Sequence, residues 1–353
     1  MKYTCVDGFS GAGGLSLGLK RAGFRIIYSF DNDPISIDTQ NLNEKYFDRV
    51  AAVKNLDDLL RKNVFLKTIN LNKGELFLLA GGPPCQGFSI QRIGEDTDER
   101  NDLVLKFGRL IERTEPMFFL LENVPGLRGK RGKRVLNSFI SSTENFGYVL
   151  YLKVLNAEDY GVPQRRKRIF IVGIRSDLHK KEFRFPLPKT FGNARITVRD
   201  TIGKLPTPPK DGSEHPAISH HRRDRLSQLN LARLRVLKAG QGREYLPYRL
   251  LADCHKINAD RIGHRNVYGR MEWNDVAPTI TARFDSFTRG KFGHPVQDRS
   301  ITLREGAMLQ TFPIDFVFSG NKVDVARQIG NAVPPKLAEI VGRQILRYYK
   351  SIL

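Results

Sequence analysis

The sequence predicts an α/β fold, with a mostly parallel sheet covered by helices on both faces and a second, smaller and irregular domain. Up to about residue 185, short apolar runs alternate with amphipathic segments, which is the pattern of successive β and α units. From residue 186 to 216, prolines, glycines and short polar segments dominate and the alternation stops. A last amphipathic stretch at 336–349 is helix-like again, so we expect the chain to return to its first domain.

Six apolar runs are the candidate strands, and the candidate helices lie between them. The strands are expected at residues 3–9, 25–30, 76–80, 117–121, 148–155 and 168–174. The helices are expected at residues 15–22, 35–43, 102–113 and 134–146. These elements set the first domain at residues 1–186 plus 322–353, and the second domain at residues 187–321.

The charge balance predicts a polyanionic partner. The 353 residues include 58 lysines and arginines against 37 acidic residues, which gives a formal net charge of +21. Such an excess points most simply to nucleic acid, because solubility alone rarely needs it. Twelve basic and only four acidic residues lie between Arg222 and Arg270. A second cluster, RGKRGKR at 128–134, has glycines between its charges and predicts a mobile basic loop.

Several function classes are disfavoured by the composition. No apolar run approaches the ~20 residues that a membrane span needs. The first residues lack a charged region followed by an apolar one, so secretion is not indicated. Only three cysteines occur (Cys5, Cys85 and Cys254), far apart, which argues against a disulfide framework and for a reducing cytoplasm. We expect no metal site, since no CxxC or Cys/His cluster is present.

A glycine-rich turn, DGFSGAGG at 7–14, follows the first candidate strand. Glycines allow the backbone to approach a ligand closely, and the helix that begins there offers free N–H groups to a carboxylate or phosphate. The second candidate strand ends in Asp31, where an acid in a βαβ unit can bind the ribose of an adenosine cofactor. A tight turn that only needs small residues would give a similar pattern.

Cys85 stands in a stiff loop, GGPPCQGFS at 81–89, directly after an apolar run. Pro83 and Pro84 have a fixed φ and no N–H, so they pre-set the loop. A thiolate on a rigid loop at the carboxyl end of a strand is well placed to act as a nucleophile. The alternative, a buried structural cysteine, suits Cys5 better, and Cys254 is interpreted as incidental.

Two further motifs place charge at strand ends. Glu122 and Asn123 follow the apolar run at 117–121, where a carboxyl group could serve as a general acid, a helix cap or an ion-pair partner. Four consecutive basic residues, 165–168, lead into the run at 168–174. A solvated charge run is the usual interpretation, but an unpaired charge at the start of an apolar strand is energetically costly.

Taken together, these motifs resemble the cytosine-C5 DNA methyltransferases, in particular the bacterial enzymes of the restriction–modification type. The resemblance spans nearly the whole chain and keeps the family's order: DGFSGAGG, GGPPCQGFS, ENV at 122–124, QRRKR at 164–168, SITLREGAMLQTFP at 300–313 and QIGNAVPP at 328–335. One departure is Asn55-Leu56, where the family often has an Asp-Ile pair that contacts adenine.

The resemblance implies an S-adenosylmethionine-dependent, Rossmann-like fold and a mechanism. Cys85 would attack C6 of a cytosine flipped out of double-stranded DNA, so that C5 accepts the methyl group. Glu122, protonated or sharing a proton, would hydrogen-bond N3, Arg168 would stabilise the O2 side, and Arg166 would support the loop. No metal is needed. The implied cofactor residues are Phe9, Ser10, Gly11, Gly13, Gly14, Asp31, Asn55, Leu56, Pro83 and Asn331.

The second domain would then recognise the target sequence, and we expect a monomer that acts in the bacterial cytoplasm on nucleoid DNA. A cognate restriction endonuclease would share the target site without forming a stable complex. Three alternatives remain open at this point. They are a tRNA cytosine-C5 methyltransferase of the same family, a catalytically dead DNA-binding homologue, and a nucleotide-dependent oxidoreductase with a redox cysteine.

Overall fold

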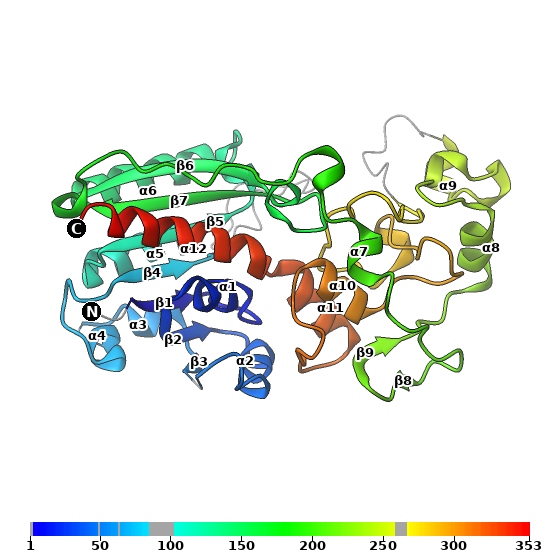
Figure 1. The fold of residues 1–353 in the computed structure, drawn as a ribbon, viewed down its shortest axis with the longest axis horizontal. Helices are drawn as coiled ribbons and strands as arrows, with labels where there is room; N and C mark the ends of the chain where they lie inside the picture. The colour runs from blue at the N-terminus through cyan, green and yellow to red at the C-terminus, as the bar shows by residue number, and fades with distance from the viewer. Residues whose placement is uncertain (1–2, 49, 63, 85–101, 258–266) are drawn as a thin grey trace. The chain divides into compact units, whose positions relative to one another are not determined.

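The computed structural model describes residues 3–48, 50–62, 64–84, 102–257 and 267–353, and it divides into two compact units (Figure 1). Unit 1 comprises Met1–Tyr160, Lys167–Lys189 and Val333–Leu353, and unit 2 comprises Gly161–Arg166 and Thr190–Ala332. The division expected after residue 186 falls after Lys189, and the return expected at residue 322 falls at Val333. The segment at 322–332, which we had assigned to the first domain, therefore belongs to unit 2.

Unit 1 is built on a seven-stranded sheet with the strand order β3-β2-β1-β4-β5-β7-β6. The strands are β1 Thr4–Gly8, β2 Arg25–Asp31, β3 Ala51–Val53, β4 Leu78–Gly81, β5 Phe118–Asn123, β6 Tyr148–Asn156 and β7 Lys167–Arg175. All pairs from β3 to β5 are parallel, whereas β7 runs antiparallel to both β5 and β6. The predicted mostly parallel α/β sheet is confirmed, and all six candidate strands form.

Helices cover both faces of the sheet, because alternate residues of each strand point to opposite sides. Phe118 of β5 contacts Tyr348 and Tyr349, whereas its neighbour Phe119 contacts Phe139 on the other face. The helices of unit 1 are α1 Gly14–Ala22, α2 Pro34–Leu42, α3 Leu56–Leu59, α4 Val64–Ile69, α5 Asp102–Thr114, α6 Lys133–Asn145 and α12 Pro335–Lys350. The sequence predicted the longer ones, but not the short α3 and α4.

The strand order reverses between β1 and β4, and this is where open α/β sheets bind ligands, outside the carboxyl ends of the strands. Because β1, β2, β4 and β5 are parallel, their carboxyl ends lie at one edge of the sheet, which we call the carboxyl edge. The glycine-rich turn, Asp31, the Gly81–Pro84 segment and Glu122 all follow or end these strands. The topology thus gathers at one edge the unit 1 residues singled out in the sequence.

The basic segment between β5 and α6 is a tight, hydrogen-bonded turn where we expected a mobile loop. A 3-10 helix spans Pro125–Arg128, and the amides of Gly129 and Lys133 donate to the carbonyls of Gly126 and Gly129, each at 2.9 Å. A Cβ at Gly132 would lie 2.4 Å from the carbonyl oxygen of Leu127, so the turn closes only around glycine. Leu127 itself is fully buried and anchors the turn.

Unit 2 has short elements joined by long connections, as expected for a less regular region. They include α7 Val198–Ile202, β8 Glu214–His215, β9 Ile218–Arg222, α8 Gln228–Val236, α9 Asp253–Ile257, α10 Leu303–Leu309 and α11 Lys322–Asn331. No helix in the described parts of either unit is both long and apolar enough to span a membrane.

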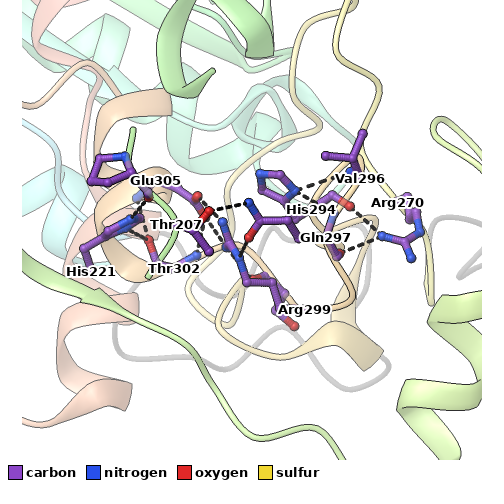
Figure 2. A network of polar contacts seen from close by, with 11 residues as sticks. Thr207, His221, Arg270, His294, Val296, Gln297, Arg299, Thr302 and Glu305 are labelled. Atoms are coloured by element: carbon purple, nitrogen blue, oxygen red, sulfur yellow. Dashed lines mark hydrogen bonds and ion pairs between the residues drawn. The ribbon is translucent and has the colours of Figure 1, made fainter. Parts of the chain in front are cut away.

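Buried polar contacts hold unit 2 together in place of a large sheet (Figure 2). Arg299 and Glu305 form an ion pair of 2.7 Å with only 2% and 1% of their side chains exposed. Burial alone would raise the pKa of Glu305, but the hydrogen bonds and charge of Arg299 hold it below its usual value. Thr302 caps α10 through a capping box with Glu305, and its hydroxyl lies 2.9 Å from Nδ1 of His221.

Candidate active site

The glycine-rich turn at the carboxyl edge begins with a non-glycine residue in a left-handed conformation. Phe9 has φ 58°, which is uncommon outside glycine and is typical of strained functional loops. The amide of Ser10 donates to the carbonyl of Phe30 at 3.1 Å, so the turn is tied to β2. Gly11 has φ 50°, and a Cβ there would meet no atom of the described residues within 4 Å. The turn therefore presents bare backbone to open space, as a closely approaching ligand requires.

Two side chains, a half-buried aspartate and a buried glutamine, fix the shape of this turn. Asp31 accepts from the amide of Gly11 at 2.8 Å and from that of Asp33 at 2.9 Å. Gln40, on α2, donates to the carbonyl of Gly11 at 2.7 Å and to the hydroxyl of Ser10 at 2.8 Å. Burial raises the pKa of Asp31, while the amides that donate to it counteract that shift. The turn is thus held from both sides, and Gln40 is a positioning residue that the sequence reasoning missed.

We expect Gln40→Ala to weaken cofactor binding by about 10-fold, because the carbonyl of Gly11 and the hydroxyl of Ser10 lose a buried donor worth roughly 1 to 1.5 kcal/mol. Isothermal titration with S-adenosylmethionine would measure the change, and the rate at saturating cofactor should change much less. Asn41→Ala is the matched control, because Asn41 is exposed on the same helix. Equal losses of affinity in both variants would contradict this role.

Asp7, at the end of β1, is a second residue that the sequence reasoning left without a role. Its side chain is fully buried, and the hydroxyl of Ser16 donates to Oδ2 at 2.6 Å. The other oxygen, Oδ1, has no hydrogen-bond partner among the described residues. Burial raises the pKa of Asp7 to about 7, the hydrogen bonds from Ser16 oppose this shift, and the charges of Asp31 and Glu122 add to it. Three carboxyl groups therefore interact at the carboxyl edge.

This shift makes stability depend on pH in a defined direction. Folded Asp7 holds a proton that the unfolded chain releases near pH 4, so its stabilising contribution is complete below about pH 4 and is lost as the pH rises through about 7. Between pH 5 and 8 we expect the free energy of unfolding to fall by about 2 to 3 kcal/mol from this group. Thermal denaturation across this range should show a flatter profile for Asp7→Asn than for the wild type. The exposed-site control Asp38→Asn should keep the wild-type slope.

The segment that leads to Cys85 is attached to the end of β5. The side-chain amide of Asn123 donates to the carbonyl of Pro83 at 3.0 Å. A Cβ at Gly82 would lie 3.2 Å from Oε2 of Glu122, so glycine lets this carboxylate come close to the segment. Cys85 itself lies outside the described residues.

Glu122 and Arg168 form an ion pair at this edge. Nε of Arg168 lies 2.9 Å from Oε1 of Glu122, with 14% and 9% of the two side chains exposed. The pair arises from sheet register, because Glu122 faces Phe170 across the antiparallel β5–β7 pair and Arg168 is the diagonal neighbour. The register thus places a carboxyl group and a guanidinium side by side at the carboxyl edge.

Arg166, which the resemblance implies supports the loop, does not join this pair. Its side chain is 1% exposed inside unit 2, so it has almost no surface to offer a base. It donates to the carbonyls of Ile280 at 2.9 Å, Gly330 at 2.8 Å and Ala332 at 3.0 Å. Arg166 is therefore a positioning residue that links the QRRKR motif to the segment at 328–335.

The remaining expected cofactor residues lie in different environments. The side chain of Leu56 is 3% exposed and packs in the core, so it has little surface for an adenine ring. Asn55 is exposed, and its side-chain oxygen Oδ1 caps α3 by accepting from the amide of Asp57 at 3.0 Å. Asn331 is the exposed last residue of α11 in unit 2, and its role in closing the cofactor site stays a prediction. Within the described residues no group of three or more potential metal ligands occurs.

Comparisons with known proteins agree with one another. The family of C-5 cytosine-specific DNA methylases matches residues 3–347. The Type II methylase M.HgiDII of Herpetosiphon aurantiacus is 36% identical over 100% of this chain and 97% of its own length. The Type II methyltransferase M1.HphI of Haemophilus parahaemolyticus is 36% identical over 98% of this chain and 87% of its own.

A solved structure resembles the chain over its whole length. It is described as a DNA modification methyltransferase encoded within a prophage of E. coli. The two structures superpose with a TM-score of 0.77 at 28% sequence identity, and the match covers 99% of this chain and 100% of the other. Because the family match, the relatives and this structure all span nearly every residue, the chain belongs to the C-5 cytosine-specific DNA methylases.

Proposed function

We propose that this chain transfers a methyl group from S-adenosylmethionine to C5 of cytosine within a specific sequence of double-stranded DNA. The observation that carries the proposal is the Glu122–Arg168 pair, which lies at the same edge as the glycine-rich turn and as the Pro83 carbonyl bound by Asn123. This edge combines a recognition site for the N3–O2 side of cytosine with the segment that leads to the cysteine nucleophile.

The chain's own residues would carry the chemistry. The thiolate of Cys85 attacks C6, which forms an S–C6 bond and makes C5 nucleophilic. Negative charge then develops on the N3–O2 edge, where Glu122, protonated or sharing a proton, hydrogen-bonds N3 and Arg168 stabilises the O2 side. After C5 has accepted the methyl group, the C5 proton leaves and the S–C6 bond breaks, which restores the cysteine. The base is reached only after it is flipped out of the duplex, at a cost of a few kcal/mol.

The turn after β1 fits the cofactor. When bound, S-adenosylmethionine supplies the electrophilic methyl group. The backbone of Ser10–Gly14 would hold its methionine end, because no described residue approaches Gly11 where a Cβ would stand and α1 begins directly afterwards. Phe9 would stack on the adenine, and Asp31 would accept hydrogen bonds from the ribose hydroxyls with the lone pairs that the amides leave free. Asn55, Pro83 and the backbone of Leu56 would complete the site, with Asn331 from unit 2.

Unit 2 is proposed as the target-recognition domain. It contains the stretch from Arg222 to Arg270 with twelve basic and four acidic residues, which suits contacts with DNA phosphates. The protein would act as a monomer in the cytoplasm, with any cognate restriction endonuclease acting separately on the same site.

Bisulfite sequencing of plasmid from cells that express the protein tests the proposal. We expect one cytosine of one sequence motif to be methylated at nearly every occurrence. Parallel reactions with labelled cofactor on DNA and on tRNA distinguish the tRNA alternative, which the Type II relatives disfavour. Unmodified DNA together with labelled tRNA would reject the proposal.

A further inference from the structure

We propose that the turn between β5 and α6 binds backbone phosphates of the DNA strand near the target cytosine, through the exposed side chains of Arg128, Lys130, Lys133 and Arg134. We call these four side chains the connector cations. The proposal rests on the proposed function, because it takes DNA as the partner. It goes further by assigning a DNA-binding surface to unit 1, in addition to the target-recognition role proposed for unit 2.

The connector cations are poorly compensated within their own segment. No aspartate or glutamate occurs between Asn123 and Thr143. α6 has no acidic residue in its first turn, and its N-cap, Gly132, provides no side-chain cap. Lys133 and Arg134 thus place positive charge at the positive end of a 13-residue helix, which disfavours the folded helix unless an anion binds nearby. A polyanionic ligand removes that penalty.

The position of the turn relates it to the target base. The turn follows β5 directly, so Arg128 lies six positions after Glu122. An extended chain spans at most about 3.6 Å per residue, which puts the two α-carbons within about 22 Å. Phosphates of one strand recur about every 3.4 Å along the helix axis, so the reachable phosphates lie within about six nucleotides of a cytosine held by Glu122.

The shape of the turn supports binding to particular phosphates. The 3-10 helix, the amide hydrogen bonds of Gly129 and Lys133, and the buried Leu127 fix the backbone on which the cations stand. The close approach of Gly132 to the carbonyl of Leu127 leaves no room for a Cβ at this position. Cations on a fixed backbone lose less conformational entropy when they bind than cations on a flexible tail.

Salt dependence of DNA binding tests the proposal. The quadruple variant Arg128→Gln, Lys130→Gln, Lys133→Gln and Arg134→Gln should retain the fold, because all four side chains are exposed. Each lost phosphate contact reduces the slope of log K against log salt concentration by about 0.9, so we expect a slope flatter by about 2 to 4 and an affinity at least about 10-fold lower near 0.1 M salt.

The matched control removes two arginines and two lysines elsewhere in unit 1: Arg25→Gln, Lys180→Gln, Arg184→Gln and Lys350→Gln, all exposed. Its slope should stay close to that of the wild type. If the slope flattened equally in both variants, only the net charge of the protein would matter. If the slope of the connector variant were unchanged, the connector cations would make no phosphate contacts. Either result overturns the proposal. Methylation by the wild-type protein is measured on the same DNA. If no methylation is found, the proposed function is rejected, but the salt slopes still decide whether the connector cations bind DNA phosphates.

Neutral methylphosphonate groups, placed singly within about six nucleotides of the target cytosine, locate the contacts. At some positions we expect the affinity of the wild-type protein to fall by about 3- to 10-fold. The connector variant should lose no further affinity at these positions, because it has already lost the contact to that phosphate. If every position weakens both proteins equally, the connector cations do not touch those phosphates and the proposal is wrong.

Discussion

Cys85→Ser should lower methyl transfer by about 10⁴-fold or more while DNA binding remains, because a hydroxyl at neutral pH is a far weaker nucleophile than a thiolate. Transfer of labelled methyl groups to plasmid DNA measures the loss, and a gel-shift assay measures binding. DNA that carries 5-fluorocytosine should trap the wild-type protein covalently, since fluorine cannot leave as the C5 proton does. The serine variant should form no such adduct.

Cys254→Ser is the control for this experiment, because it makes the same chemical change at an exposed cysteine in α9 of unit 2. It should retain activity and adduct formation. A Cys85→Ser protein that still formed the 5-fluorocytosine adduct would exclude Cys85 as the nucleophile. Loss of the adduct only in the Cys254→Ser variant would move the assignment to that residue.

Much of unit 1 was predictable because local pattern and global fold agree there. Apolar runs of four to nine residues form the strands, and amphipathic segments form the long helices. β3 was not predictable in the same way, because three residues of AAV carry too little alternation to distinguish a strand from a turn. Its place comes from pairing with β2, which is a tertiary contact.

A site residue was predictable from the sequence where its residue type is unusual for its position. It was not predictable where its role depends only on contacts in the folded structure. Glu122 and Arg168 stood out as charges at the ends of apolar strands, and the register of β5 and β7 pairs them. Gln40 looked like any polar residue of an amphipathic helix. The available signal was its spacing of three from Ile37, which places a polar group on the buried face of α2.

The contacts of Arg166 could not be read from the sequence. Arg166 and Arg168 are two positions apart in one basic run, so an extended segment would place both side chains on the same side, but their partners differ. Arg166 precedes β7 and donates to three carbonyls of unit 2, whereas Arg168 lies within β7. The boundary between the units runs between them, at Lys167, and no sequence periodicity marks it.

Glu122→Gln should lower the rate of methyl transfer at saturating DNA by about 10²- to 10³-fold, the usual cost of losing one group that stabilises charge in a transition state. The amide keeps the shape of the side chain, so DNA binding should change little. It also leaves the largely buried guanidinium of Arg168 without its carboxylate, and we expect the free energy of unfolding to fall by about 1 to 3 kcal/mol.

A double-mutant cycle with Arg168→Gln separates these two effects. Loss of the pair should give a coupling free energy above about 1 kcal/mol in unfolding experiments, because both side chains are shielded from solvent. The control cycle uses Arg165 and Asp275 of unit 2, whose ion pair is shorter at 2.6 Å but 54% and 42% exposed, and should give less than about 1 kcal/mol. If the rate loss of Glu122→Gln followed its stability loss, and recovered when stability was restored at lower temperature, Glu122 would only support the fold. A rate loss that persists at every temperature below the unfolding transition requires the carboxyl group in the reaction itself.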